Sequence, residues 1–167
     1  LATAAELRDQ HKGRVVTFSP KVFVPLTNLC RDFCGYCTFR KAPDERAAKT
    51  MTLDEVLDVV RSGKLLGCTE VLFSLGDKPE AIYPEMKQFL AERGHQRTLD
   101  YLYEACRVVL EETALLPHSN PGLMGRGDLK RLREVNASLG LMLESVSERL
   151  LLAGGAHDNA PDKKPLV

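Results

Sequence analysis

The chain has 167 residues, of which 44% are apolar and 28% are charged, and its 23 basic residues balance its 23 acidic ones. This size and composition are typical of one globular domain with its own core. The balanced charge predicts no nucleic-acid partner, and the short apolar runs predict no membrane span. Five cysteines and no visible secretory signal indicate the cytoplasm, a reducing compartment where thiols more often bind metal than pair.

The predicted elements alternate between strand and helix along the chain. Short β-rich runs are predicted as strands at residues 22–26, 71–75, 114–118 and 139–143. Helices are predicted to begin at Thr52, Pro84, Thr98 and Asp128. Thr52 and Glu55 form a capping-box pattern, and Thr98 and Asp128 are the predicted caps of their helices. This β-then-α order predicts parallel strands with right-handed crossovers.

The number of β/α units defines the expected fold. A complete (β/α)8 barrel needs about 250 residues, so about four units predict an α/β fold that is part of a TIM-like barrel. A doubly wound open sheet is the alternative. Because the chain starts at Leu1 and stops in a loop, we expect a fragment: residues 1–14 as a lead-in and 15–167 as the N-terminal part of a truncated core domain. Uncovered strand edges predict poor solubility.

Three cysteines follow the first predicted strand. Cys30, Cys34 and Cys37 have the spacing C-x3-C-x2-C, and three thiolates on one loop leave one iron of a four-iron cluster without a protein ligand. Cys68 and Cys106 occupy positions where a free cysteine packs as a small hydrophobe. Zinc favours paired C-x2-C units or Cys/His sets, and the four histidines are scattered. The loop therefore indicates a 4Fe-4S cluster, with zinc or simple packing as alternatives.

Residues 27–39, which we term the cysteine loop, carry a resemblance to a known family. With Tyr36 as the aromatic residue before the last cysteine, this loop resembles that of the radical S-adenosylmethionine (SAM) superfamily. The resemblance implies a partial (β/α)6 barrel with the cluster after the first strand. It also implies that the open iron binds SAM and that the reduced cluster cleaves SAM to methionine and a 5′-deoxyadenosyl radical. The protein then orients the cofactors and excludes water.

Further segments resemble the FO synthase family, which makes the deazaflavin chromophore of coenzyme F-420. They are the cysteine loop with residues 22–26, residues 73–80, residues 116–124 and, more weakly, residues 140–145 and 161–163. The resemblance implies a lyase that cyclises a tyrosine-derived hydroxybenzyl–ribityldiaminouracil adduct with loss of ammonia. It also implies a low-potential electron donor and a partner half or subunit. The chain then belongs to a separate cyclising subunit or to the N-terminal half of a fused enzyme.

Polar residues after the later strands complete the expected SAM site. Gly76 lets the backbone approach the amino group of SAM closely. Asp77 or Glu80 adds an acceptor for that group, with an ordinary turn before a proline as the alternative for Asp77. By resemblance Glu144 is a carboxylate that contacts SAM and Arg149 pairs with the carboxylate of SAM, with a helix-terminal charge and a solvated side chain as alternatives. The cofactor-binding set is Tyr36, Gly76, Asp77, Glu80, Asn120, Glu144 and Arg149.

Three other interpretations stay open. The first is a different radical SAM enzyme, such as a menaquinone-pathway or biotin-synthase-like member, although the loop after the second strand disfavours it. A non-catalytic iron–sulfur electron carrier is the second interpretation, and it requires a fourth ligand and no SAM loop. The third is a truncated pseudo-enzyme. No residue is assigned a catalytic role from the sequence.

Overall fold

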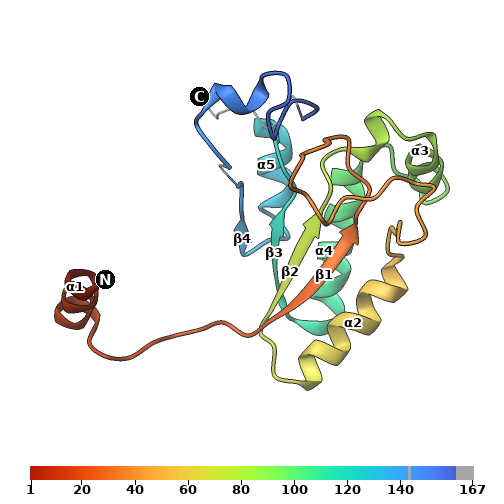
Figure 1. Ribbon diagram of the computed structural model, residues 1–167. Coiled ribbons are helices and arrows are strands. Elements are labelled where there is room, and N and C mark those ends of the chain that lie inside the picture. The colour runs from red at the N-terminus through yellow and green to blue at the C-terminus, as the bar shows by residue number, and fades with distance from the viewer. Residues whose placement is uncertain (143, 161–167) are drawn as a thin grey trace.

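The chain is seen in a computed structural model that describes residues 1–142 and 144–160. Within these residues, four parallel strands form one sheet in the order β1-β2-β3-β4 (Figure 1). The strands are β1 (Lys21–Thr27), β2 (Glu70–Leu75), β3 (Leu116–Asn120) and β4 (Ser138–Leu139). The helices are α1 (Ala2–Lys12), α2 (Leu53–Leu65), α3 (Pro84–Ala91), α4 (Thr98–Thr113) and α5 (Arg126–Leu132), with 3-10 turns η1 (Pro79–Ala81) and η2 (Glu148–Leu151).

The strand order decides between the two predicted architectures. Parallel neighbours that follow one another in sequence, with helices between them, have crossovers that return along one face of the sheet. A doubly wound sheet instead reverses its strand order at a switch point. The α/β fold with a partial TIM-like barrel is therefore confirmed, and the loops after the strands meet at the carboxyl edge of the sheet.

The main core lies between the sheet and the helices α2 and α4. Val24, Phe73 and Leu102 are completely buried there. The predicted capping box starts α2: the amide of Glu55 donates to Thr52 Oγ1 at 3.3 Å, and the amide of Thr52 donates to the Glu55 carboxylate at 2.9 Å. These two hydrogen bonds satisfy backbone amides that have no partner within the first turn of the helix.

Two predicted helix caps were wrong. The side chain of Thr98 does not cap α4; it lies inside the first turn, and its amide and hydroxyl both donate to the carboxylate of Glu80. Gly125 occupies the N-cap of α5, while Asp128 lies in the first turn and pairs with Arg97 at 2.8 Å. The local sequence predicted that Thr98 and Asp128 each cap their own helix. In the structure both side chains instead interact with a charged residue on another segment, Glu80 and Arg97 respectively.

The third and fourth strands also differ from the prediction. The structure begins β3 at Leu116 because α4 continues to Thr113 and ends at Ala114, which has a left-handed φ of 57°. As a result Asn120 is the last residue of the strand. The fourth strand is only Ser138–Leu139, and the predicted run of residues 139–143 ends at a residue outside those described.

The N-terminal segment lies away from the sheet. Helix α1, described in full, has no buried residue and lies apart from the rest of the chain (Figure 1). Residues 13–20 connect it to β1. No helix within the described part of the chain combines the length and apolar character needed to cross a membrane.

Candidate functional site

A cavity of about 190 Å³ lies at the carboxyl edge of the sheet. Its wall combines residues of the cysteine loop with residues that end or follow β2, β3 and β4. Eight of the ten predicted site residues line it: Cys30, Cys34, Cys37, Tyr36, Gly76, Asp77, Asn120 and Glu144. The other two predicted residues, Glu80 and Arg149, are described by the structure but do not belong to this wall.

Backbone amides point at two of the three cysteine sulfurs. The amide of Asp77 donates to Cys30 Sγ at 3.1 Å and that of Asp32 at 3.4 Å, while the amide of Arg40 donates to Cys37 Sγ at 3.4 Å. Burial raises the pKa of the Cys30 thiol, and the two amides oppose that rise. Amide donors favour the thiolate over the thiol, and the thiolate is the form that binds metal.

The three cysteines are compatible with a four-iron cluster. No three His, Cys, Asp or Glu side chains among the described residues stand close enough together to hold one metal ion. In a four-iron cluster each thiolate binds a different iron, so its ligands lie farther apart. Cys68 and Cys106 are outside the cavity wall, and Cys106 is fully buried in the core as predicted. The residues therefore fit a cluster with three cysteine ligands.

Arg40 places a guanidinium group in the wall of the cavity. Its side chain lines the cavity, its guanidinium lies 3.6 Å from the centre of the Phe33 ring, and Nη2 donates to Tyr83 Oη at 2.7 Å. The Nε atom is buried and has no hydrogen-bond partner among residues 1–142 and 144–160. Because a buried donor without an acceptor is costly, this atom still requires an acceptor.

Gly76 brings the loop after β2 into contact with the cysteine loop. A Cβ at this position would lie 2.0 Å from the backbone oxygen of Leu29 and 2.6 Å from Cβ of Cys30. Its amide also donates to the oxygen of Thr27 at 2.9 Å. The close approach that requires a glycine is therefore made to the protein's own backbone, whereas the predicted contact with SAM stays a prediction.

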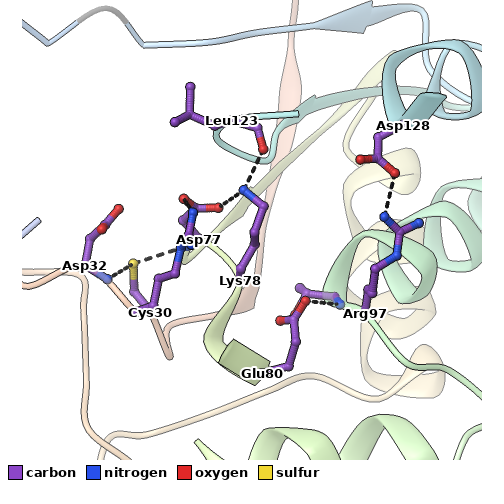
Figure 2. A network of polar contacts seen from close by, with 10 residues as sticks. Cys30, Asp32, Asp77, Lys78, Glu80, Arg97, Leu123 and Asp128 are labelled. Atoms are coloured by element: carbon purple, nitrogen blue, oxygen red, sulfur yellow. Dashed lines mark hydrogen bonds and ion pairs between the residues drawn. The ribbon is translucent and has the colours of Figure 1, made fainter. Parts of the chain in front are cut away.

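The carboxylate of Asp77 has two cationic partners within the protein. Its oxygens pair with Arg31 Nη2 at 3.1 Å and with Lys78 Nζ at 2.9 Å, and its side chain is only 6% exposed. Figure 2 shows the pair with Lys78. Glu80 is engaged elsewhere, since its carboxylate accepts from Thr98 at the start of α4. Arg149 lies on η2. The structure thus gives Asp77 and Glu80 protein partners where the sequence predicted a ligand.

Tyr36 joins two segments that are far apart in sequence. Its hydroxyl donates to the carboxylate of Glu144 at 3.0 Å and lies 3.0 Å from Nε2 of His157. Burial and the hydrogen bond with Glu144 both raise the pKa of Tyr36. Glu144 has a left-handed φ of 34°, a strained conformation that is common at functional sites.

His157 belongs to a segment whose role the sequence did not reveal. The backbone oxygen of Asn159 accepts from the amide of Phe33, and that of Ala156 accepts from the amide of Gly35, both at 2.8 Å. His157 itself is only 2% exposed. Residues 156–159 therefore pair with the cysteine loop. Tyr36 and His157 are 121 residues apart in the sequence, so no spacing rule could have predicted their contact.

Comparison with known proteins assigns this chain to a family. The model of the radical SAM superfamily matches residues 24–161. The chain is 46% identical to the 7,8-didemethyl-8-hydroxy-5-deazariboflavin synthase of Methanopyrus kandleri, over 90% of this chain and 45% of that protein. It is 50% identical to the FO synthase of Nocardia farcinica, over 99% of this chain and 20% of that protein. The chain thus spans less than half the length of these relatives.

Two solved structures share the fold of this chain. Methylornithine synthase aligns with a TM-score of 0.65 and 23% identity, over 89% of this chain and 40% of that one. The FeFe-hydrogenase maturase HydG from Carboxydothermus hydrogenoformans aligns with a TM-score of 0.74 and 21% identity, over 98% and 34% respectively. Identities this low support the fold alone. Together with the family match and the cavity lined by three cysteines, they show that this chain belongs to the radical SAM superfamily.

Proposed function

We propose that this chain forms part of the radical SAM core of an FO synthase, in the half that carries out the cyclisation. The observation that carries the proposal is the convergence of Cys30, Cys34, Cys37, Asn120 and Glu144 around one cavity. It occurs in a chain that is 46% and 50% identical to two enzymes of deazaflavin synthesis over nearly its whole length. In this proposal residues 15–167 are the N-terminal part of the core domain and residues 1–14 are a lead-in.

The superfamily implies a 4Fe-4S cluster and SAM, and we assign their contacts to residues of the cavity wall. Cys30, Cys34 and Cys37 would ligate the cluster, which with SAM supplies one-electron cleavage chemistry when bound. Asn120 and Glu144 offer oxygen acceptors to polar groups of SAM, and Tyr36 orients the Glu144 carboxylate through its hydrogen bond. Leu75, Leu141 and Met142 contribute apolar surface to the wall.

The substrate and partners follow from the similarity to FO synthases. We propose that the substrate is the tyrosine-derived hydroxybenzyl–ribityldiaminouracil adduct, which closes its central ring with loss of ammonia. A low-potential donor supplies the electron, and a second FO synthase half or subunit supplies the adduct. The reaction takes place in the cytoplasm. Holding a large polar substrate beside the site of radical formation is a problem of proximity, so we expect residues beyond this chain to complete the pocket.

The full-length protein tests the proposal directly. It is loaded with iron and sulfide without oxygen and then given SAM, dithionite and the adduct. We expect 5′-deoxyadenosine together with the absorbance of a deazaflavin, and a Cys34→Ala variant should give neither. Deoxyadenosine without a deazaflavin would point to another radical SAM enzyme. A reduced cluster whose electron paramagnetic resonance spectrum does not change with SAM would favour an electron carrier instead.

A further inference from the structure

Three charged residues lie close to Cys30, which is partly buried. Arg31 follows Cys30 on the cysteine loop, and Asp77 and Lys78 follow β2. The Asp77 carboxylate pairs with Arg31 at 3.1 Å and with Lys78 at 2.9 Å. The side chains are 22%, 6% and 27% exposed for Arg31, Asp77 and Lys78 respectively. We term these three residues the charge triad; Figure 2 shows Asp77 between Cys30 and Lys78.

Backbone contacts connect the charge triad to the cysteine sulfur. The amide of Asp77 donates to Cys30 Sγ at 3.1 Å, and the amide of Arg31 donates to the backbone oxygen of Asp77 at 3.0 Å. Lys78 Nζ also donates to the backbone oxygen of Leu123 in the loop after β3, at 2.6 Å. The charge triad therefore joins the loops that follow three strands, and Asp77 places its own amide on Cys30.

The loop that carries Asp77 is shaped for this arrangement. Lys78 has a left-handed φ of 36°, which is uncommon for a residue other than glycine. Gly122, with a φ of 79°, approaches so closely that a Cβ there would lie 3.1 Å from the Asp77 carboxyl group. Backbone strain of this kind persists only where the surroundings hold it in place. The carboxylate thus has a fixed position beside the cysteine loop.

The two loops that meet at Cys30 carry charged residues of both signs. Arg31 and Lys78 contribute two positive charges, and Asp77 and the buried Asp32 contribute two negative ones. Charges that are partly buried are screened much less than surface charges. The reduction potential of an iron–sulfur cluster depends on the net charge around it and on hydrogen bonds to its sulfurs. Asp77 affects both quantities at Cys30, through its carboxylate and its amide.

We propose that the charge triad sets the reduction potential of the cluster, and that Asp77 is a positioning residue for Cys30, not an acceptor for the amino group of SAM. The inference rests on the proposed cluster. Reduction adds one electron from the low-potential donor, so a more positive surrounding stabilises the reduced cluster. Neutralising Asp77 therefore raises the potential, and neutralising Lys78 lowers it.

The test measures the potential of the cluster in the full-length protein before SAM is added. Asp77→Asn, Lys78→Gln and the double variant are loaded with iron and sulfide and titrated with dithionite, with electron paramagnetic resonance as the readout. We expect each single variant to shift the reduction equilibrium about tenfold in opposite directions, which is about 59 mV for one electron. The double variant should return close to the original potential because it removes one negative and one positive charge and so leaves the net charge unchanged.

Asp128→Asn is the matched control. Asp128 also pairs with an arginine, Arg97, at 2.8 Å, and Figure 2 shows this pair apart from Cys30. The control should leave the potential unchanged. If Asp77→Asn and the double variant fail to retain iron, Lys78→Gln still carries the test, because it keeps Asp77 and its expected fall in potential is measured on its own. An unchanged potential in Lys78→Gln would then overturn the inference.

Two outcomes would overturn the inference while leaving the proposed function intact. One is an intact cluster whose potential is the same in all variants. The other is a weaker binding of SAM in Asp77→Asn at an unchanged potential, which would make Asp77 an acceptor for SAM. If the unaltered protein forms no cluster at all, the proposed function fails, and this inference fails with it.

Discussion

The helical side of the sheet and its carboxyl edge are stabilised in different ways. On the helical side, apolar residues from β1, β2 and α4 are completely buried. At the carboxyl edge, Leu29 is buried, but Phe33 is 46% and Tyr36 is 52% exposed. The cysteine loop is fixed mainly by backbone hydrogen bonds and by the charge triad.

This difference indicates that the buried core contributes most of the stability, whereas the carboxyl edge carries the candidate site. Full burial of a large apolar side chain contributes about 1.5–3 kcal/mol, whereas a typical hydrogen bond contributes a net of about 0.5–1.5 kcal/mol. Segments with few apolar contacts open locally at a lower free energy than the core does. We therefore expect substitutions in the core to unfold the domain, and substitutions at the carboxyl edge to remove function while the domain stays folded.

The largest expected effect comes from a cysteine. Cys34→Ser removes one of the three thiolates, and we expect complete loss of SAM cleavage in the full-length protein. Because Cys34 is only partly buried, the free energy of unfolding of the cluster-free protein should change by about 0.5 kcal/mol or less. Deoxyadenosine analysis and urea unfolding measure the two quantities. A large decrease in the free energy of unfolding of the cluster-free variant would contradict the expectation that substitutions at the carboxyl edge leave the domain folded.

The reverse effect is expected in the core. Phe73 is completely buried in β2, and Phe73→Ala should lower the free energy of unfolding by about 3–5 kcal/mol. Phe18 is 87% exposed, so Phe18→Ala is the matched control and should change stability by about 0.5 kcal/mol or less. Urea unfolding followed by circular dichroism compares the two. Equal effects would show that the core does not dominate stability.

Gly76 lies at the junction of the two regions. Gly76→Ala places a methyl group against the backbone of Leu29, so we expect a cost of about 1–3 kcal/mol together with reduced iron content, because the cysteine loop is displaced. A methyl group added at Gly127 in α5 would meet no described atom within 4 Å, so Gly127→Ala should retain both stability and iron. Iron analysis and urea unfolding measure the iron content and the free energy of unfolding of both variants. Normal iron content in Gly76→Ala would mean that the loop tolerates the displacement.

Glu80 distinguishes a structural contact from a cofactor contact. Its carboxylate accepts from the first turn of α4, so Glu80→Ala should lower the free energy of unfolding by about 1 kcal/mol and leave SAM affinity unchanged. Glu111→Ala, on the exposed side of α4, is the control. Equilibrium binding of SAM and urea unfolding are measured in parallel. A marked loss of SAM affinity would restore the role that the sequence predicted for Glu80.

The smallest effect depends on pH and is confined to the helices. Burial raises the pKa of Asp100, but its interactions with Arg97 and Arg131 outweigh burial and lower that pKa below its ordinary value. A lowered pKa in the folded state stabilises the protein above the ordinary pKa, and this contribution is lost as the pH falls through the folded-state value. Asp100→Asn should therefore lower the unfolding temperature near neutral pH, and the difference should shrink in acid. Asp58→Asn, on the exposed side of α2, is the control.

The sequence alone predicted the order of the elements from β1 to β4, the start of α2 and the cysteine motif, since these depend on signals within a few residues. It did not predict α1. Periodicity identifies a helix, a Thr-x-x-Glu pattern identifies its start, and the spacing of thiols on one loop identifies a metal ligand set. It also predicted a close backbone approach at Gly76 to SAM, whereas the structure shows a close approach to the backbone of Leu29. It misassigned the helix caps at Thr98 and Asp128, because their partners are charged residues on other segments.

Only the tertiary structure decided which polar groups meet. Asp77 lies beside Arg31, and Tyr36 beside His157, because the parallel register of the sheet brings the loops after its strands to one edge. That register is set by the burial of apolar residues along whole strands, so it cannot be read from the residues of the loops themselves. The chain's sequence therefore predicts the three cysteine ligands of the proposed cluster, while its fold decides which charged residues lie beside Cys30.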